Sequence, residues 1–253
     1  AADTEAAGYH RYRDTVCLLQ VSTRDRTWVV DTLELRHVTP LVAPLADESI
    51  EVVFHHADYD LRLLHRDFGV AVRGLFDTKI AAELLGEPGL GLASLLERHV
   101  GLTIPKKYQR ADWAKRPLPD DMLDYAAEDT RHLLQLRDAL RAELEAKGRL
   151  HWAEEEFRLR ERTLWEVVPE EDTYRVKGSR DLNRRQLAAL RELFEWREAL
   201  AEERDQASFR VVSNNDLVLV ARALPRSRAD LVAAGLSEGN ARRWGRDLLD
   251  AVQ

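Results

Sequence analysis

The sequence predicts two folded units: an α/β unit, in which a mixed sheet is flanked by helices, and a smaller all-helical unit after it. The first half alternates strand-like runs with helical patterns, whereas the last part shows only helical periodicity. Between them, segment 163–182 is polar, contains Pro169 and Gly178, and has no sustained period. A chain of 253 residues favours two domains. We therefore expect a first domain over 1–162, a linker over 163–182 and a second domain over 183–253.

Five strands are expected in the first unit. Three follow one another across polar turns, and two flank a segment, 57–66, whose apolar residues recur at helical spacing. The chain then becomes helical, and 118–147 is predicted as one long helix or a helix pair that Gly148 ends. Three strands, then strand–helix–strand, then helices indicate a mixed sheet covered by helices. The predicted strands are 1–5, 16–22, 27–30, 50–54 and 74–77.

The second unit is predicted to be a bundle of helices. Leu187, Leu190 and Phe194 mark one amphipathic helix, and segment 217–224 marks another. Ser227, with an aspartate three residues later, resembles a capping box for a third helix. A further helix is expected after Ser237, which could cap it.

Composition excludes several classes of protein. The single cysteine rules out a disulfide framework and a multi-cysteine zinc site. The net charge is −7, so this is not a basic protein that coats nucleic acid non-specifically. No apolar run approaches the roughly 18 residues that a membrane span needs, and no signal-peptide pattern is visible. We therefore expect a cytoplasmic protein with no membrane partner.

Asp3 and Glu5 lie two apart in a predicted strand, so both side chains point to the same face. Two carboxylates projecting together are unfavourable unless a cation lies between them. The simpler interpretation is a solvated edge or a turn, because Asp-x-Glu alone is common.

Tyr125 and Asp129 lie four apart in a predicted helix and therefore share a face. Asp60 follows a predicted strand in the first turn of a helix, where α/β folds place functional groups. His55 and His56 directly follow the same strand and could in principle bind zinc. Adjacent residues of a strand face opposite ways, however, and no third ligand stands at the usual spacing, so structural roles are favoured for both histidines.

Together these residues resemble the DEDD superfamily of 3′–5′ exonucleases, in the subgroup with tyrosine in its last motif. Further segments resemble the ribonuclease D branch of that superfamily, and the second unit is similar to an HRDC domain. The resemblance implies a ribonuclease H-like fold and covers nearly the whole chain. The residues that carry the ribonuclease D likeness are 17–20, 76–78, 81–82, 106–113, 116–118 and 123–127, and those that carry the HRDC likeness are Leu193, Trp196, Arg197, 211–217, Pro225 and Leu231.

The resemblance implies two divalent ions, Mg²⁺ or Mn²⁺, held by four carboxylates. Asp3 would bridge both ions, Glu5 and Asp129 would complete the site of the ion that carries the attacking water, and Asp60 would face the second ion. All-oxygen ligation suits such hard cations. Tyr125, with an unperturbed pKa near 10, is a poor general base and is expected to orient the water instead. The expected catalytic residues are therefore Asp3, Glu5, Asp60, Tyr125 and Asp129.

Segment 106–113 is the expected substrate strip. Lys106, Lys107 and Arg110 can neutralise phosphates. Gln109 could contact the sugar edge or the scissile phosphate, and Trp113 could stack on a base or belong to the core. In the helical unit, candidate phosphate contacts, which could equally form a solvated face, are Arg184, Arg185, Arg210, Arg242, Arg243 and Arg246.

The favoured function is a 3′–5′ exoribonuclease that releases nucleoside 5′-monophosphates from RNA with a free 3′ end, such as tRNA precursors, and acts as a monomer. One alternative is a 3′–5′ DNA exonuclease acting on single-stranded DNA, since proofreading domains share the same carboxylates. Another is a catalytically silent nucleic-acid-binding adaptor on the same fold. The five intact polar residues argue against the adaptor.

Overall fold

The structure, a computed structural model, describes residues 1–35, 37–104, 107–167 and 175–253. Contacts divide the chain into two compact units: Ala1–Ala7 with Thr15–Glu166, and Gly8–Asp14 with Val167–Gln253. The domain and linker boundaries drawn from the sequence stay predictions. Within the described residues, no helix is both long and apolar enough to span a membrane.

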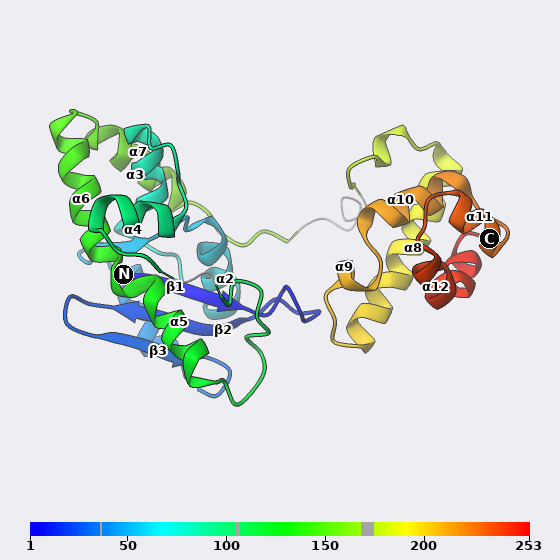
Figure 1. Ribbon diagram of the computed structural model, residues 1–253, viewed down its shortest axis with the longest axis horizontal. Helices are drawn as coiled ribbons and strands as arrows, with labels where there is room; N and C mark the ends of the chain where they lie inside the picture. The colour runs from blue at the N-terminus through cyan, green and yellow to red at the C-terminus, as the bar shows by residue number, and fades with distance from the viewer. Residues whose placement is uncertain (36, 105–106, 168–174) are drawn as a thin grey trace. The chain divides into compact units, whose positions relative to one another are not determined.

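Within the described residues, the first unit is built on five short strands, and Figure 1 labels β1, β2 and β3. β1, β2 and β3 pair antiparallel in that order, and β4 pairs with β5 in parallel. β1 also contacts β4, which brings the antiparallel and parallel parts together. The mixed α/β class predicted from the sequence is thereby confirmed. The strands are β1 (Ala2–Ala6), β2 (Val16–Ser22), β3 (Thr27–Asp31), β4 (Val52–Phe54) and β5 (Leu75–Asp77).

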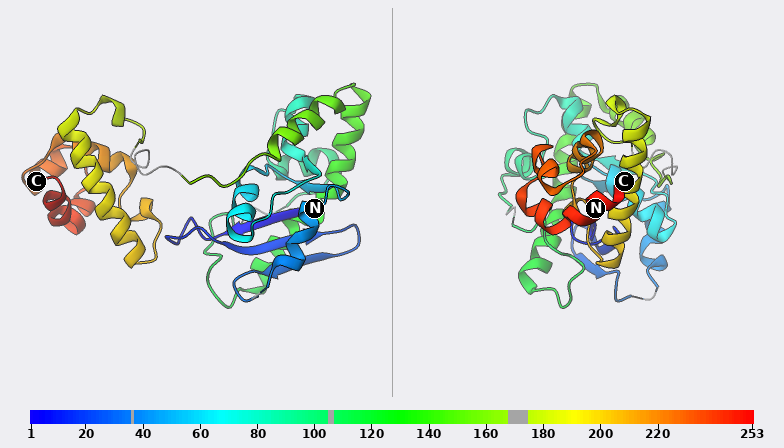
Figure 2. Two further views of the ribbon diagram at one scale, coloured as in Figure 1. Left: turned by 180° about the vertical axis from the view of Figure 1, so that it is seen from behind. Right: turned by 90° about the vertical axis from the view of Figure 1, so that its right-hand side faces the viewer.

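Alternation along β2 sends neighbouring side chains to opposite faces. Leu19 packs with Leu61 and Leu64 of helix α2 (Asp58–Phe68), whereas Leu18 packs with Met122 of helix α5 (Asp120–Arg131). The two helices therefore cover opposite faces of the sheet, as Figures 1 and 2 show.

Helices α3, α4, α6 and α7 form a separate layer over β4 and β5, whereas α1 packs on the α2 side through Val42. The predicted helix pair over 118–147 is α5 and α6, which meet at His132. Gly148 adopts a left-handed conformation (φ 64°) just past the end of α6, as a glycine can without steric cost. These helices are α1 (Thr39–Val42), α3 (Thr78–Leu85), α4 (Leu92–Val100), α6 (Leu133–Ala146) and α7 (Leu150–Arg160).

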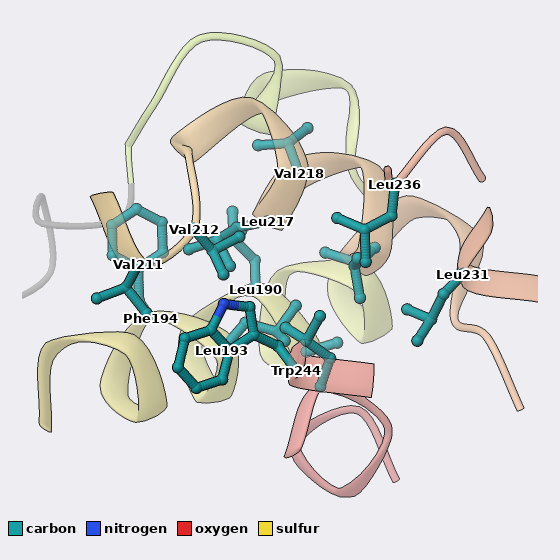
Figure 3. Close-up of a cluster of buried hydrophobic side chains, with 14 of the residues drawn as sticks. Leu190, Leu193, Phe194, Val211, Val212, Leu217, Val218, Leu231, Leu236 and Trp244 are labelled. Atoms are coloured by element: carbon teal, nitrogen blue, oxygen red, sulfur yellow. The ribbon is translucent and has the colours of Figure 1, made fainter. Parts of the chain in front are cut away.

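The second unit is all-helical, as predicted. Asn183 and Gln186 form a capping box at the start of α8, and Ser227 and Asp230 form the predicted one at α11. Its core contains Trp244 of α12 and side chains from α8, α9, α10 and α11 (Figure 3). The helices are α8 (Arg184–Glu203), α9 (Ser208–Val211), α10 (Asn214–Ala223), α11 (Arg228–Ala233) and α12 (Glu238–Ala251).

Candidate active site

β1 carries the first two predicted site residues. Asp3 lies opposite Gln20 of β2 and Glu5 opposite Leu18, so both carboxylates point to the α5 face of the sheet. Both are half-buried. Thr4 between them is buried, and its hydroxyl donates a hydrogen bond to Asp60 Oδ1 at 2.5 Å. The strand therefore presents two carboxylates on one face and holds a third through its intervening threonine.

Asp60 lies in the first turn of α2 and is 6% exposed. The turn that leads into α2 is held by Asp77, which is itself 1% exposed at the end of β5. Asp77 accepts hydrogen bonds from the backbone N–H groups of His56 (3.0 Å) and Ala57 (2.9 Å). The same carboxylate caps α3 by accepting from the N–H of Lys79 at 2.9 Å. Asp77 thus holds the turn that follows β4 and the start of α3 that follows β5, and thereby the position of Asp60.

α5 supplies Tyr125 and, one turn later, Asp129. The Tyr125 ring is buried and stacks on Trp113 with 6.2 Å between ring centroids. Tyr108 packs edge-on against the same tyrosine, at 5.7 Å. These two aromatic neighbours restrict the ring of Tyr125 and therefore the direction of its hydroxyl.

A hydroxyl pair also fixes α5 against the sheet. Ser22 Oγ of β2 lies 2.8 Å from Thr130 Oγ1 of α5, and both residues are buried. Thr130 is the residue after Asp129, so this contact sets the distance of the Asp129 backbone from the strands. The carboxylate of Asp129 thereby keeps its place relative to β1.

Four of the five predicted catalytic residues line one cavity of about 280 Å³. A neighbouring cavity of about 270 Å³ shares part of its wall, including Gln109, Tyr125 and Asp129. Asp60 is not among the residues that line the first cavity and accepts the hydrogen bond from Thr4. The residues lining the first cavity are Asp3, Glu5, His55, Leu92, Gln109, Tyr125, Asp129 and Leu133.

The pKa values of the β1 carboxylates are strongly raised. Burial raises the pKa of Asp3 well above its usual range, and the charges of the three other carboxylates raise it further. Burial also raises the pKa of Glu5 to about 9, with further contributions from the charges of Asp129 and Asp60. The two side chains therefore resist ionisation in the absence of a neighbouring cation.

The pKa values of the other predicted catalytic residues are raised as well. Burial raises the pKa of Asp60 to about 7, although the hydrogen bond from Thr4 opposes the rise. Burial raises the pKa of Asp129 to about 7 as well, with a contribution from the charge of Glu128. The pKa of the Tyr125 hydroxyl is raised above its ordinary value by burial and then by the nearby carboxylates. Tyr125 therefore keeps its proton and can donate a hydrogen bond.

The donor set of this site fits a hard divalent cation. The donors are carboxylate oxygens that raise one another's pKa values, and a divalent cation among them would relieve that repulsion. In the part of the chain that the structure describes, no three His, Cys, Asp or Glu side chains are close enough together to hold an ion as they stand.

His55, for which the sequence analysis favoured a structural role, also lines the cavity. It directly follows β4, is half-buried and lines the cavity beside the β1 carboxylates. Its Nδ1 lies 2.9 Å from Thr78 Oγ1, and burial lowers its pKa to about 4. His56, by contrast, is exposed and has a positive φ of 65° in the turn before α2. The position of His55 at the end of a parallel strand was the signal available in the sequence.

The predicted substrate strip is only partly at the cavity. Gln109 is exposed and lines both cavities. Arg110 is exposed, and Lys107 is exposed with its Nζ 2.8 Å from Asp121 Oδ2. Lys106 lies outside the described residues. Of the described residues of this strip that were predicted to bind substrate, Gln109 lines the cavity, and its contact with a substrate stays a prediction.

The burial of Trp113 shows that the predicted contact of this residue with the substrate is wrong. Its side chain is 2% exposed and belongs to a core cluster with Cys17, Leu18 and Met122. A base cannot stack on a ring whose faces are already covered by protein. The residue contributes instead by supporting the ring of Tyr125.

Two protein families match this chain. The 3′–5′ exonuclease family matches residues 1–145, and the HRDC domain family matches residues 186–252. Exosome complex component 10 of Rattus norvegicus is 36% identical over 244 residues, which cover 92% of this chain but only 28% of that relative. The chain thus spans little more than a quarter of the length of that protein.

Ribonuclease D of Escherichia coli K12 is 37% identical over 255 residues, covering 100% of this chain and 68% of that relative. The crystal structure of Escherichia coli RNase D, described as an exoribonuclease involved in structured RNA processing, matches with a TM-score of 0.75. That match covers 99% of this chain and 68% of the other. Divalent metal dependence is general in this exonuclease family. The chain belongs to the ribonuclease D family of 3′–5′ exonucleases, with an HRDC domain after the exonuclease domain.

Proposed function

We propose that the chain is a 3′–5′ exoribonuclease that hydrolyses phosphodiester bonds from RNA 3′ ends and releases nucleoside 5′-monophosphates. The observation that carries the proposal is the cavity on which Asp3, Glu5, Tyr125 and Asp129 meet. Repelling carboxylates gathered around a cavity, with a protonated tyrosine beside them, are unfavourable for folding and suit metal-assisted hydrolysis.

In this proposal Asp3, Glu5, Asp60 and Asp129 hold two divalent ions, Mg²⁺ or Mn²⁺. When bound, such a pair supplies an activated water and stabilises the leaving 3′ oxygen. Tyr125 cannot act as a base, because its pKa is raised, but its hydroxyl can donate a hydrogen bond that orients the attacking oxygen. Its two aromatic neighbours keep that hydroxyl in place.

The proposed substrate is RNA with a free 3′ end, including tRNA precursors. The support is the similarity to Escherichia coli RNase D, which is described as acting in structured RNA processing. Gln109, exposed at the junction of the two cavities, is placed to contact the terminal nucleotide. Lys107 and Arg110 nearby in the chain would contact phosphates, and Lys106 stays a predicted contact. The monomeric state and the cytoplasmic location also stay predictions.

The test is degradation of RNA in buffers with Mg²⁺, Mn²⁺ or EDTA, with one sample labelled at its 5′ end to follow shortening and one labelled uniformly to follow the released nucleotides. We expect a ladder that shortens from the 3′ end, mononucleotide products with a 5′-phosphate, and no activity in EDTA. A DNA oligonucleotide of the same sequence tests the alternative DNA exonuclease, which would degrade it at least as fast. Endonucleolytic fragments, or full activity in EDTA, would contradict the proposal.

Asp60→Asn is the matched inactive control for this assay. The asparagine side-chain oxygen can still accept the hydrogen bond from Thr4, so the fold is expected to persist. The substitution removes one negative charge from the proposed ligand set, and we expect turnover to fall by at least about 10²–10³-fold. Wild-type activity of this variant in Mg²⁺ would exclude Asp60 from the mechanism.

A further inference from the structure

The side chain of Thr78 determines which nitrogen of His55 carries the proton. Thr78 Oγ1 lies 3.1 Å from the backbone carbonyl oxygen of Phe54 and 2.9 Å from His55 Nδ1. A hydroxyl has one proton, and a carbonyl oxygen can only accept, so the hydroxyl proton goes to Phe54. The remaining lone pairs of Thr78 Oγ1 can then only accept a proton from His55. Because Thr78 is 0% exposed, water cannot replace either partner.

The Nδ1–H form of His55 leaves Nε2 as a bare acceptor. Burial lowers the pKa of His55 to about 4, so the ring is neutral at neutral pH and Nε2 carries no proton. The ring lines the cavity beside Asp3 and Glu5, and no hydrogen bond joins Nε2 to any described residue. His55 Nε2 is therefore a neutral acceptor that faces the cavity without a hydrogen-bond partner among the described residues.

An acceptor at this place selects for a donor in the substrate. The phosphate oxygens of a nucleic acid only accept hydrogen bonds, so Nε2 does not favour them. The sugar at an RNA 3′ end carries two hydroxyl donors, the 2′-OH and the 3′-OH, whereas a DNA end carries only the 3′-OH. We infer that His55 Nε2 accepts a hydrogen bond from a hydroxyl of the 3′-terminal ribose and so recognises the RNA end. This inference rests on the proposed exoribonuclease function.

The tautomer itself can be measured without any activity. Long-range ¹H–¹⁵N correlation spectra of the labelled protein in EDTA distinguish the Nδ1–H and Nε2–H forms of each histidine. His55→Phe assigns the resonance by its disappearance among the eight histidines. We expect the Nδ1–H form for His55. The Nε2–H form would overturn the inference whether or not the protein degrades RNA.

Recognition is tested with three RNA oligonucleotides that differ only in the last sugar, which is ribose, 2′-deoxyribose or 3′-deoxyribose. In single-turnover cleavage, we expect the wild type to lose about tenfold in rate on the oligonucleotide that lacks the hydroxyl bound by Nε2. The two deoxy substrates show which hydroxyl that is. We expect His55→Phe, which keeps a ring but lacks the acceptor, to cleave all three within about twofold of one another.

His56→Asn is the matched control, because asparagine tolerates the left-handed backbone at that exposed position. It should retain the wild-type preference. If neither deoxy substrate is disfavoured by the wild type, or if His55→Phe keeps the full preference, the inference is wrong. A wild-type protein that leaves unmodified RNA intact would instead contradict the proposed function, while the tautomer measurement would still report on His55.

Discussion

Replacing Glu5 with glutamine should stabilise the fold in the absence of divalent ions. Burial and the charges of Asp129 and Asp60 raise the pKa of Glu5 from 4.5 to about 9. At pH 7 the folded state must keep a proton that the unfolded chain releases, which costs about 3 kcal/mol. Water screens part of this effect at a half-buried side chain, so we expect about 2 kcal/mol. Glutamine has nearly the same shape and no charge to release.

The sign of the pH dependence follows from the raised pKa. The cost of keeping the Glu5 proton in the folded wild type is smallest near pH 4.5. It grows as the pH rises towards 9, so the free energy of unfolding of the wild type falls over that range. The advantage of Glu5→Gln over the wild type should therefore be small at pH 5 and grow at pH 7 and pH 8.

Thermal unfolding in EDTA at pH 5, 7 and 8 measures this effect, with the melting temperature of the first unit as the readout. Glu97→Gln, at an exposed position of α4, controls for the loss of a surface charge and should show no such trend. Adding Mg²⁺ should stabilise the wild type more than Glu5→Gln. A variant that is less stable than the wild type at pH 8 in EDTA would refute the electrostatic account of the site.

Two further predictions concern catalysis and RNA affinity. Tyr125→Phe should bind RNA normally but cleave it more slowly in single-turnover kinetics, because a water-orienting hydroxyl acts mainly in the transition state. If the variant instead loses RNA affinity and its chemical step is unchanged, Tyr125 is a binding residue. Arg242 and Arg246 are exposed one turn apart on α12. If both contact RNA phosphates, their replacement by alanine should reduce the slope of log affinity against log salt by roughly 0.7 per contact, and an unchanged slope would show that they do not.

Local periodicity predicted each pair of site residues separately, and the resemblance to the DEDD exonucleases joined the pairs into one predicted site. Strand alternation alone places Asp3 and Glu5 on one face, and helical spacing alone places Tyr125 and Asp129 on another. The structure brings both pairs to a single cavity. The prediction of a mixed sheet succeeded for the same reason, since strand 16–22 and its neighbours have clear β patterns.

The parts that the sequence could not show depend on contacts between distant residues. The hydrogen-bond partner of His55 Nδ1 is Thr78, which lies 23 residues away at the start of another element. Asp77 holds the turn before Asp60 from across the parallel strand pair. Trp113 lies in a loop without periodicity, so its burial against Tyr125 has no local signature.

The most direct test of the central claim is to locate manganese in crystals of the protein. Crystals soaked in MnCl₂ and measured near the manganese absorption edge should show two anomalous peaks among the carboxylates of Asp3, Glu5, Asp60 and Asp129. The same soak of Asp60→Asn should lose or weaken at least one of them. Well-diffracting soaked crystals with no manganese among these carboxylates would contradict the assignment of this cavity as the catalytic centre.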